Sequence, residues 1–292
     1  RGGRGAGEPD AGRVCGGGVK PGRRRLVALC LWAAACAASA VELALRCDGP
    51  DGRPVPGTTW LALRDAEGGE VLSGAAVDGS CRVVLPLGRY WVKAQAPGMR
   101  SVPIRVAEGV APGAALRLQP LQGADAKAQQ RLAEMVQHDQ AVREALGDAE
   151  RTGDAAAVQR AEQALAMTDT AHRAEMARWL REKGFPRMAD VGYDGVGAFW
   201  LLLQHAPDLL EGQLPALRAA VAAGELSRAD LALSEDRVDL LRGRPQRYGS
   251  QLRPGPDGKL EPYWLADPES VDARRAAMDL EPLAAYLKRF ER

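Results

Sequence analysis

Residues 115–146 read ALRLQPLQGADAKAQQRLAEMVQHDQAVREAL, and the spacing of apolar residues changes within this stretch. Before Pro120, apolar and polar residues alternate, which is the period of a half-buried β-strand. Later, Leu132, Met135 and Val136 follow the three-to-four-residue period of an amphipathic helix. The sequence therefore predicts a chain with a β domain first and an all-α domain after it.

Upstream of this change, short apolar segments are separated by Gly, Pro and Asp residues. The predicted strands are residues 41–45, 59–63, 71–77, 82–85, 90–94, 102–106 and 115–118. Short strands at this spacing are typical of a β-sandwich, so we expect a seven-stranded β-sandwich over residues 41–120. Cys47 and Cys81 are an even pair inside it, and they predict a disulfide in an oxidising compartment. The alternative is two buried free thiols.

The turns of this region carry a recognisable set of residues. They include Asp51-Gly52-Arg53-Pro54-Val55-Pro56-Gly57, Leu85-Pro86-Leu87-Gly88-Arg89-Tyr90 and Ala96-Pro97-Gly98. Residues 41–120 thereby resemble the carboxypeptidase-regulatory-like, or prealbumin-like, β-sandwich family. The resemblance implies a non-catalytic accessory module of a kind common in exported proteins. One departure is Cys81, which stands where the family has an aromatic residue.

The amino-terminal residues have the layout of an export signal. Residues 1–18 are rich in Gly and Arg, and we interpret them as a disordered leader. A basic segment then precedes the apolar run 26–38 and the triplet Ala38-Ser39-Ala40. This order predicts a signal peptide cleaved near Ala40, so that residues 1–40 are removed. The run is also shorter than the ~20 residues that a membrane span needs.

We therefore expect a periplasmic or secreted protein with no stable membrane span in the mature chain. Two alternatives remain open: a lipoprotein site at Cys36 and a twin-arginine signal at Arg24-Arg25, each of which lacks part of its usual motif. The formal net charge is +1. Because phosphate-backbone binding needs a concentrated basic face, this balance gives no support for a nucleic-acid partner.

Residues 123–292 predict an all-α helical bundle with one long loop. Helical periodicity leads to Gly184, the apolar run 196–203 marks a central helix, and further helices extend to Leu241. Residues 243–266 carry Pro and Gly throughout. Loops of this length in compact domains are usually functional or disordered. Two short helices are expected after it.

The helical domain contains an ordered set of short motifs. They are Asp139-Gln140-x-x-Arg143, Gly184-Phe185-Pro186, Val191-Gly192, Leu203-Gln204-His205-Ala206, Asp236-Arg237-Val238, Gln246-x-Tyr248-Gly249-Ser250-Gln251 and Arg274-Arg275. As a set they are similar to a bacterial family of unknown function with the signature Q-x-Y-G-[TS]-Q. The resemblance spans most of residues 130–287. It makes Asp139, Arg143 and Arg275 candidate ligand-binding residues, but it implies no reaction.

His205 is the candidate catalytic residue. Pro207 stops the most apolar helix just after it, and the helix dipole at such an end favours an imidazolium. We interpret His205 as a general acid/base or a ligand donor. The alternative is a helix-capping histidine bonded to a backbone carbonyl.

Four further residues are candidate ligand contacts. Arg237 lies on an apolar helix stripe, so its guanidinium must be paired with a distant group, for which Asp139 is a candidate. It is either a member of a structural buried pair or an anion clamp for a ligand. Gln246, Tyr248 and Gln251 lie on the long loop and offer uncharged donors and acceptors, which suit a neutral polar ligand such as a sugar or an amide. The alternative is that these groups only attach the loop to the bundle.

Two functions are compatible with these residues. The one we favour is an envelope protein that binds a small polar ligand or an envelope protein through its helical domain. The other is an enzyme that acts on a polar envelope-derived substrate with His205 as acid/base. The chain has three His and no C-x-x-C, H-E-x-x-H, Walker or dinucleotide motif. We therefore expect no metal site and no cofactor.

Overall fold

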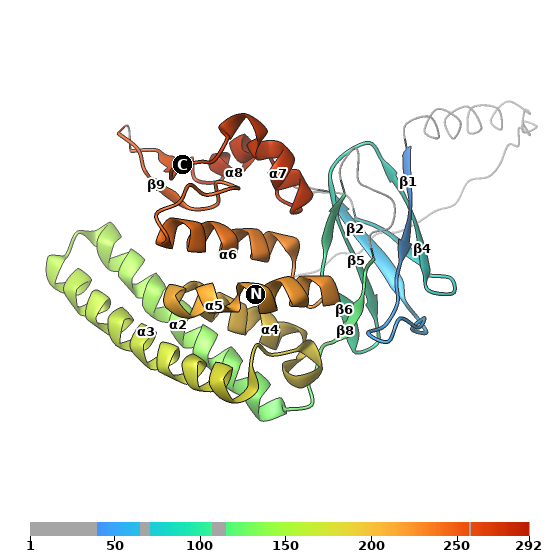
Figure 1. The fold of residues 1–292 in the computed structure, drawn as a ribbon, viewed down its shortest axis with the longest axis horizontal. Helices are drawn as coiled ribbons and strands as arrows, with labels where there is room; N and C mark the ends of the chain where they lie inside the picture. Colours follow the sequence, from blue (N-terminus) through green and yellow to red (C-terminus); the bar gives the residue numbers. More distant parts are fainter. Residues whose placement is uncertain (1–39, 65–70, 107–114, 257, 292) are drawn as a thin grey trace, which may run out of the picture. The chain divides into compact units, whose positions relative to one another are not determined.

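The structure is a computed structural model that describes residues 40–64, 71–106, 115–256 and 258–291. The predicted leader, the signal peptide up to Ser39 and Cys36 lie outside these residues. Residues Val41–Arg292 form one compact unit. Along it, a β-rich region is followed by a helical region (Figure 1). No helix in the described part of the chain is both long and apolar enough to span a membrane.

The β-rich region contains two sheets. A two-stranded sheet pairs β1 (Ala40–Arg46) with β4 (Ser80–Pro86). The other sheet has the order β3-β2-β5-β6-β8, and β7 also pairs with β5. Its strands are β2 (Thr59–Arg64), β3 (Val71–Ala75), β5 (Tyr90–Ala96), β6 (Met99–Ser101), β7 (Ile104–Val106) and β8 (Leu118–Pro120).

This strand pattern differs from the seven-stranded β-sandwich that the sequence predicts. The expected strand over residues 102–106 is replaced by β6 and β7, which pair with opposite ends of β5. Pro103 lies between them, and a proline has no N–H to give to a strand ladder. The described residues up to Pro120 therefore form eight strands, and six of them belong to one sheet.

The hydrophobic core of the β-rich region is formed by side chains of both sheets. Every second residue of β4 is buried, as are Tyr90, Val92 and Ala94 of β5, and these side chains share one hydrophobic cluster. The predicted disulfide is present: Cys47 is bonded to Cys81, and both cysteines are fully buried in that cluster. It links the end of β1 to β4.

The helical region begins with two long helices and continues with three shorter ones. They are α2 (Ala126–Thr152), α3 (Ala155–Lys183), α4 (Met188–Gln204), α5 (Pro207–Ala223) and α6 (Arg228–Leu241). Asp125 and Asp154 cap α2 and α3 by accepting hydrogen bonds from backbone N–H groups. Gly153, in the left-handed conformation, ends α2 and lets α3 run back beside it (Figure 1).

A second hydrophobic cluster forms the core of the helical region. It includes Leu132 and Met135 of α2, Met176 of α3 and Phe199 of α4, together with residues of α5 and α6. The periodicity that predicts α2 therefore identifies residues that are buried. The apolar residues of α4 pack against several neighbouring helices. His205 directly follows the last residue of α4 and contacts α2.

The expectation of an all-α region needs correction in its long loop. β9 (Leu252–Pro254) and β10 (Leu260–Pro262) pair as an antiparallel hairpin within it. Each strand has three residues, too few for an alternating pattern to be visible in the sequence. The chain ends with the 3-10 turn η1 (Pro268–Ser270), α7 (Val271–Ala277) and α8 (Leu283–Lys288).

Candidate functional site

The carboxyl end of α4 contacts both α2 and α6. Gln204 Nε2 donates to Ser234 Oγ of α6 at 3.0 Å, and the next residue places His205 Nδ1 2.9 Å from Asp139 Oδ1 of α2. Arg237 follows Ser234 by one helical turn, so the two residues share a face of α6. The Arg237 cluster is defined as Asp139, Arg143, Gln204, His205 and Arg237.

Asp139 is a buried carboxylate whose oxygens are all engaged. It accepts hydrogen bonds from Gln140 Nε2 at 2.8 Å and from Arg143 Nε at 3.2 Å, and it also contacts His205. Burial alone would raise its pKa, but the hydrogen bond from Arg143 and the neighbouring His205 hold the pKa of Asp139 below its usual value. Asp139 is therefore an ionised, fully partnered group.

His205 presents one ring nitrogen to Asp139 and leaves the other free. Because a carboxylate can only accept, Nδ1 carries the hydrogen and Nε2 keeps its lone pair. Nε2 makes no hydrogen bond to the residues that the structure describes. Burial, and then the charge of Arg143, lower the pKa of His205. The direction of this pKa shift is opposite to the one that the helix end alone predicts.

Arg237 differs from the expectation that it is paired with Asp139. That carboxylate is occupied by Arg143 and His205, and Arg143 Nη2 also lies 2.6 Å from Asp169 Oδ1. Within the described ranges Arg237 has no ion pair, and its Nε is buried without a hydrogen-bond partner. Burial, and then repulsion from Arg143, lower its pKa. The charge that acts on Arg237 is therefore another cation.

Gln204 also has a buried polar atom without a hydrogen-bond partner. Its side chain is 5% exposed, and its Oε1 is buried without a donor while Nε2 is held by Ser234. A buried donor on Arg237 and a buried acceptor on Gln204 thus occur on adjoining helices. Unpartnered buried polar atoms are rare in folded proteins and call for an explanation.

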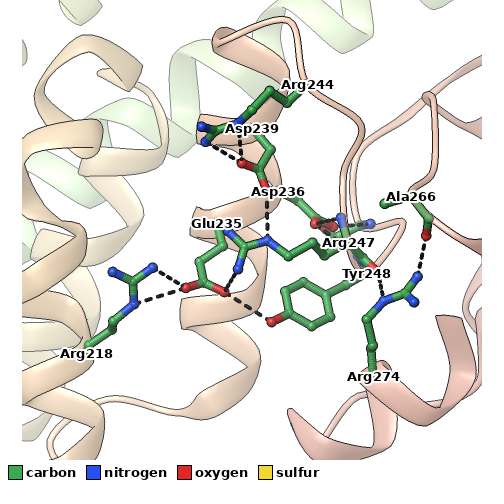
Figure 2. A network of polar contacts seen from close by, with 10 residues as sticks. Arg218, Glu235, Asp236, Asp239, Arg244, Arg247, Tyr248, Ala266 and Arg274 are labelled. Atoms are coloured by element: carbon green, nitrogen blue, oxygen red, sulfur yellow. Dashed lines mark hydrogen bonds and ion pairs between the residues drawn. The ribbon is translucent and has the colours of Figure 1, made fainter. Parts of the chain in front are cut away.

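The long loop is attached to α6 by three acidic side chains. Asp236 accepts from the backbone N–H groups of Arg247 at 2.7 Å, Tyr248 at 3.0 Å and Ser250 at 2.9 Å. Figure 2 shows this carboxylate facing the loop, with Glu235 and Asp239 on either side of it. The loop anchor is defined as Glu235, Asp236 and Asp239 with residues 244–251.

The other two acids of the loop anchor bind side chains. Glu235 accepts from Tyr248 Oη at 3.1 Å and from Arg218 Nη2 at 2.6 Å. Asp239 accepts from Arg244 Nη2 at 2.6 Å and from Arg247 Nε at 2.9 Å. Burial, and then the charge of Glu235, raise the pKa of Tyr248 to about 12, so its phenol stays a neutral donor.

Gln246 and Gln251 complete the turn of the loop itself. Gln246 is fully buried; its Nε2 donates to the carbonyls of Gln251 at 3.0 Å and Tyr263 at 2.9 Å, and its Oε1 accepts from Gln251 N at 3.0 Å. Gln251 Nε2 donates to Ser250 Oγ at 3.1 Å. The signature Q-x-Y-G-S-Q is therefore a set of hydrogen bonds that fixes the loop.

Arg274 and Arg275 hold the loop from its other side. Arg274 Nε donates to Arg247 O at 2.8 Å. Arg275 is 1% exposed and donates from Nη1 to Tyr248 O at 2.6 Å and from Nε to Glu281 O at 2.5 Å. The guanidinium of Arg275 is thus bound by backbone carbonyls, which indicates a structural role.

The predicted site residues thus divide into two groups. Asp139, Arg143, His205 and Arg237 are assigned to the Arg237 cluster, whereas the loop residues belong to the loop anchor and Arg275 binds it through Tyr248 O. Within the described part of the chain, no cluster of three or more His, Cys, Asp or Glu is arranged to hold a metal.

Several residues of these groups and their partners are not candidates on sequence grounds, among them Gln204, Asp236 and Asp169. Gln204 was visible in the Leu203-Gln204-His205-Ala206 motif and was passed over in favour of the histidine beside it. Asp236 stood next to Arg237, but nothing in the sequence indicates that it accepts from a loop eleven or more residues later. Asp169, the second partner of Arg143, gives no signal in the helix that contains it.

The comparisons with known proteins support the resemblance of the helical domain to a family of unknown function. The model described as "Family of unknown function (DUF6624)" matches residues 126–292, which include both groups. No curated protein and no solved structure matches the chain. The family match covers more than half of the sequence, and on that basis the chain belongs to the DUF6624 family.

Proposed function

We propose that the helical region binds a small oxyanion, such as a phosphate or carboxylate group, at the Arg237 cluster. The observation that carries the proposal is the buried, unpartnered Nε of Arg237, on which Arg143 acts as a second cation. A cation taken out of water without a partner destabilises a protein by several kcal/mol. A bound anion would offset that cost.

The two unpartnered atoms, Arg237 Nε and Gln204 Oε1, restrict the chemical class of the ligand. A guanidinium is suited to oxyanions because its N–H groups match two oxygens at once. Gln204 Oε1, at the end of the neighbouring helix α4, is a buried acceptor without a donor. A ligand with both an anionic oxygen and a hydroxyl group, such as a protonated phosphate or a hydroxy acid, offers a partner to each of these two types of atom.

The loop residues support this site indirectly. The amide of Gln246 and the phenol of Tyr248 are engaged within the loop anchor, so they are not offered to a neutral ligand. The loop anchor instead fixes Glu235 and Asp236, the two residues that precede Arg237 on α6. We infer that its role is to hold α6, and with it the guanidinium, in place.

We further propose that the protein is exported and that residues 41–120 serve as a prealbumin-like spacer. The signal-like order of residues 20–40 supports export. The Cys47–Cys81 disulfide is compatible with an oxidising compartment, since disulfides persist mainly there. The two-sheet arrangement of the β-rich region supports the comparison with an accessory β-sandwich.

Isothermal titration calorimetry with inorganic phosphate tests the binding proposal. Arg237→Met should weaken phosphate binding at least tenfold, about 1.4 kcal/mol, because the guanidinium is lost. Arg242→Met is the matched control: it removes the same charge next to α6, where Arg242 is exposed and paired with Glu211. Wild type and Arg242→Met should bind alike.

Three results of this titration would contradict the proposal. They are no binding of either phosphate or acetate by the wild type, equal binding by Arg237→Met, and equal loss in both variants. Acetate and glucose serve as further probes. Acetate tests whether a carboxylate replaces phosphate, and saturable binding of glucose alone would favour a neutral-ligand site instead.

A further inference from the structure

We propose that a cavity at the start of α4 binds a small organic ammonium ion, that is, an amine with an apolar body. The cavity has a volume of about 390 Å³, within the range of about 300–1,000 Å³ that is usual for small-molecule sites. Its α4 residues lie in the first turn of that helix, whereas the Arg237 cluster uses the other end of α4. The inference therefore concerns a separate site and goes beyond the oxyanion binding proposed above.

The cavity lies where the residue that caps α2, the end of α3 and the first turn of α4 meet. Its lining includes the apolar side chains of Trp179, Pro186 and Val191 and the charged side chains of Asp125, Lys183 and Asp190. Asp125 N donates to Asp190 O at 2.9 Å, and Ala124 N donates to Ala189 O at 2.9 Å. These backbone hydrogen bonds join the cap of α2 to the start of α4, so the cavity is part of the packed helical region.

The side chain of Lys183 indicates which chemical group this cavity accepts. Its Nζ lies 4.6 Å from the centre of the Trp179 ring and 3.3 Å from Asp125 Oδ2. The negative face of an indole attracts cations, and Trp is the best side chain for this contact. An alkylammonium group of the chain itself is therefore held here by an aromatic face and a carboxylate. The same two groups suit the ammonium of a ligand.

Lys183 is able to give up this position. Its side chain is 53% exposed, and that of Asp125 is 46% exposed. Ion pairs at such exposed positions contribute little to stability. Lys183 is the last residue of α3, and its flexible four-carbon stem can turn into solvent without a movement of the helix. An amine from solution can thus replace the lysine ammonium at low cost.

The charges of the lining favour a cation. Among its described residues, the carboxylates of Asp125 and Asp190 stand against the ammonium of Lys183, which leaves one negative charge in excess. Asp190 is also bound by Arg187 at 3.0 Å, but the side chain of Arg187 is 67% exposed and is not part of that lining. A carboxylate has more than two acceptor positions, so Asp190 is able to accept from a ligand as well.

The uncharged part of the lining specifies the body of the ligand. Trp179, Pro186 and Val191 offer apolar surface, and the Trp179 ring also packs against Phe199 at a centroid distance of 5.8 Å. Apolar and aromatic walls with a few charged groups are the usual composition of small-molecule sites. A singly charged amine with an aromatic or branched apolar body therefore fits this cavity.

Proton–nitrogen NMR of the indole groups of the full chain tests the proposal. The probe is benzylammonium, and benzyl alcohol is the matched neutral molecule. Benzylammonium should cause a saturable shift of the Nε1–H signal of Trp179, which is assigned by its absence in Trp179→Phe. Benzyl alcohol should bind about fivefold more weakly or less, because the attraction of one charge pair about 4 Å apart in water corresponds to about this factor.

Three variants assign the binding to the cavity. Asp190→Asn should weaken benzylammonium binding about fivefold, because it removes one of the carboxylates. Asp208→Asn is the matched control, since Asp208 lies in the first turn of α5, pairs with the exposed Arg173 and is not among the described lining residues. Its binding should equal that of the wild type. Lys183→Met should tighten binding about fivefold, because it removes the competing ammonium from the Trp179 ring and from Asp125.

Four results would overturn the proposal. They are no saturable binding of benzylammonium by the wild type, equal binding of benzyl alcohol, an equal loss in Asp190→Asn and Asp208→Asn, and weaker binding by Lys183→Met. Phosphate binding, measured by calorimetry, should be the same in Asp190→Asn as in the wild type. The two sites are therefore tested independently of each other.

Discussion

The two polar groups of the helical region are built from the same residue types but differ in how their charges are matched. In the loop anchor, Asp236 accepts three backbone N–H groups, and Glu235 and Asp239 each bind arginine side chains. In the Arg237 cluster, Asp139 is equally well partnered, yet Arg237 has no ion pair within the described residues and its buried Nε has no hydrogen-bond partner.

The two groups therefore differ in what their polar atoms are used for. The side chains of Gln246, Tyr248 and Gln251 form hydrogen bonds that fix a loop. The candidate site lies where the buried Nε of Arg237 and Oε1 of Gln204 lack partners. Completed hydrogen bonds indicate a structural role, whereas a buried polar atom without a partner calls for an explanation, of which a bound ligand is one.

The largest effect is expected from breaking the loop anchor. Asp236→Ala leaves three backbone N–H groups of the loop without an acceptor, and each buried unsatisfied donor costs about 1–3 kcal/mol. The free energy of unfolding should therefore fall by about 3 kcal/mol or more, measured by urea denaturation. Asp236→Asn keeps one acceptor and should lose less. A loss below about 1 kcal/mol in Asp236→Ala would contradict the assignment of Asp236 as the main attachment.

A smaller effect is expected from Tyr248→Phe. This change removes one hydrogen bond to Glu235, worth about 1–2 kcal/mol because the acceptor is charged. The same denaturation experiment measures it. Phosphate binding should be unchanged, since the phenol belongs to the loop anchor. A Tyr248→Phe variant with wild-type stability and no phosphate binding would move the site to the loop.

Arg237→Met should change the free energy of unfolding in the opposite direction. Replacing a partly buried, unpaired cation by an apolar side chain of similar size should leave the free energy of unfolding unchanged or raise it by about 1 kcal/mol in phosphate-free buffer. Arg275→Met, which removes a cation that contacts Glu281 O, Tyr248 O and the Tyr286 ring, should lower it. Equal losses in both variants would show that Arg237 has a partner.

The smallest effect concerns pH. The folded-state pKa of His205 and of His172 is lowered, in both cases first by burial. Their contribution to stability is present above the ordinary histidine pKa of about 6.5 and is lost as pH falls through the lowered folded values, because the unfolded chain then binds more protons. Stability should decline from pH 7 to pH 5, and His205→Gln should decline less steeply. A steeper decline in the variant would contradict the lowered pKa.

Part of this fold could be predicted from local sequence and part could not. Pro207 locates the end of α4 and therefore His205, and the periodicity of Leu132 and Met135 identifies the core face of α2. These features depend on neighbours within one or two turns. The division of a strand at Pro103 and the hairpin of β9 and β10 depend on short segments whose pattern is too brief to interpret.

The candidate site was predictable only in its residue types. His205, Asp139 and Arg237 were all identified, but which of them pair is a long-range property. Asp139 and His205 are 66 residues apart in the sequence, and Asp139 also binds Arg143, whereas Arg237 has no ion pair within the described residues. Spacing in one sequence cannot decide between two arginines for one carboxylate.

The most direct test of oxyanion binding at the Arg237 cluster follows the NMR signal of the Arg237 guanidinium itself. In a proton–nitrogen NMR spectrum of the arginine side chains, the Nε–H signal of Arg237, assigned by its absence in Arg237→Met, is recorded while inorganic phosphate is added. The account predicts a saturable shift of this signal, with the signal of Arg275 unchanged. An Arg237 signal that does not respond, or that moves no more than that of Arg275, would contradict it.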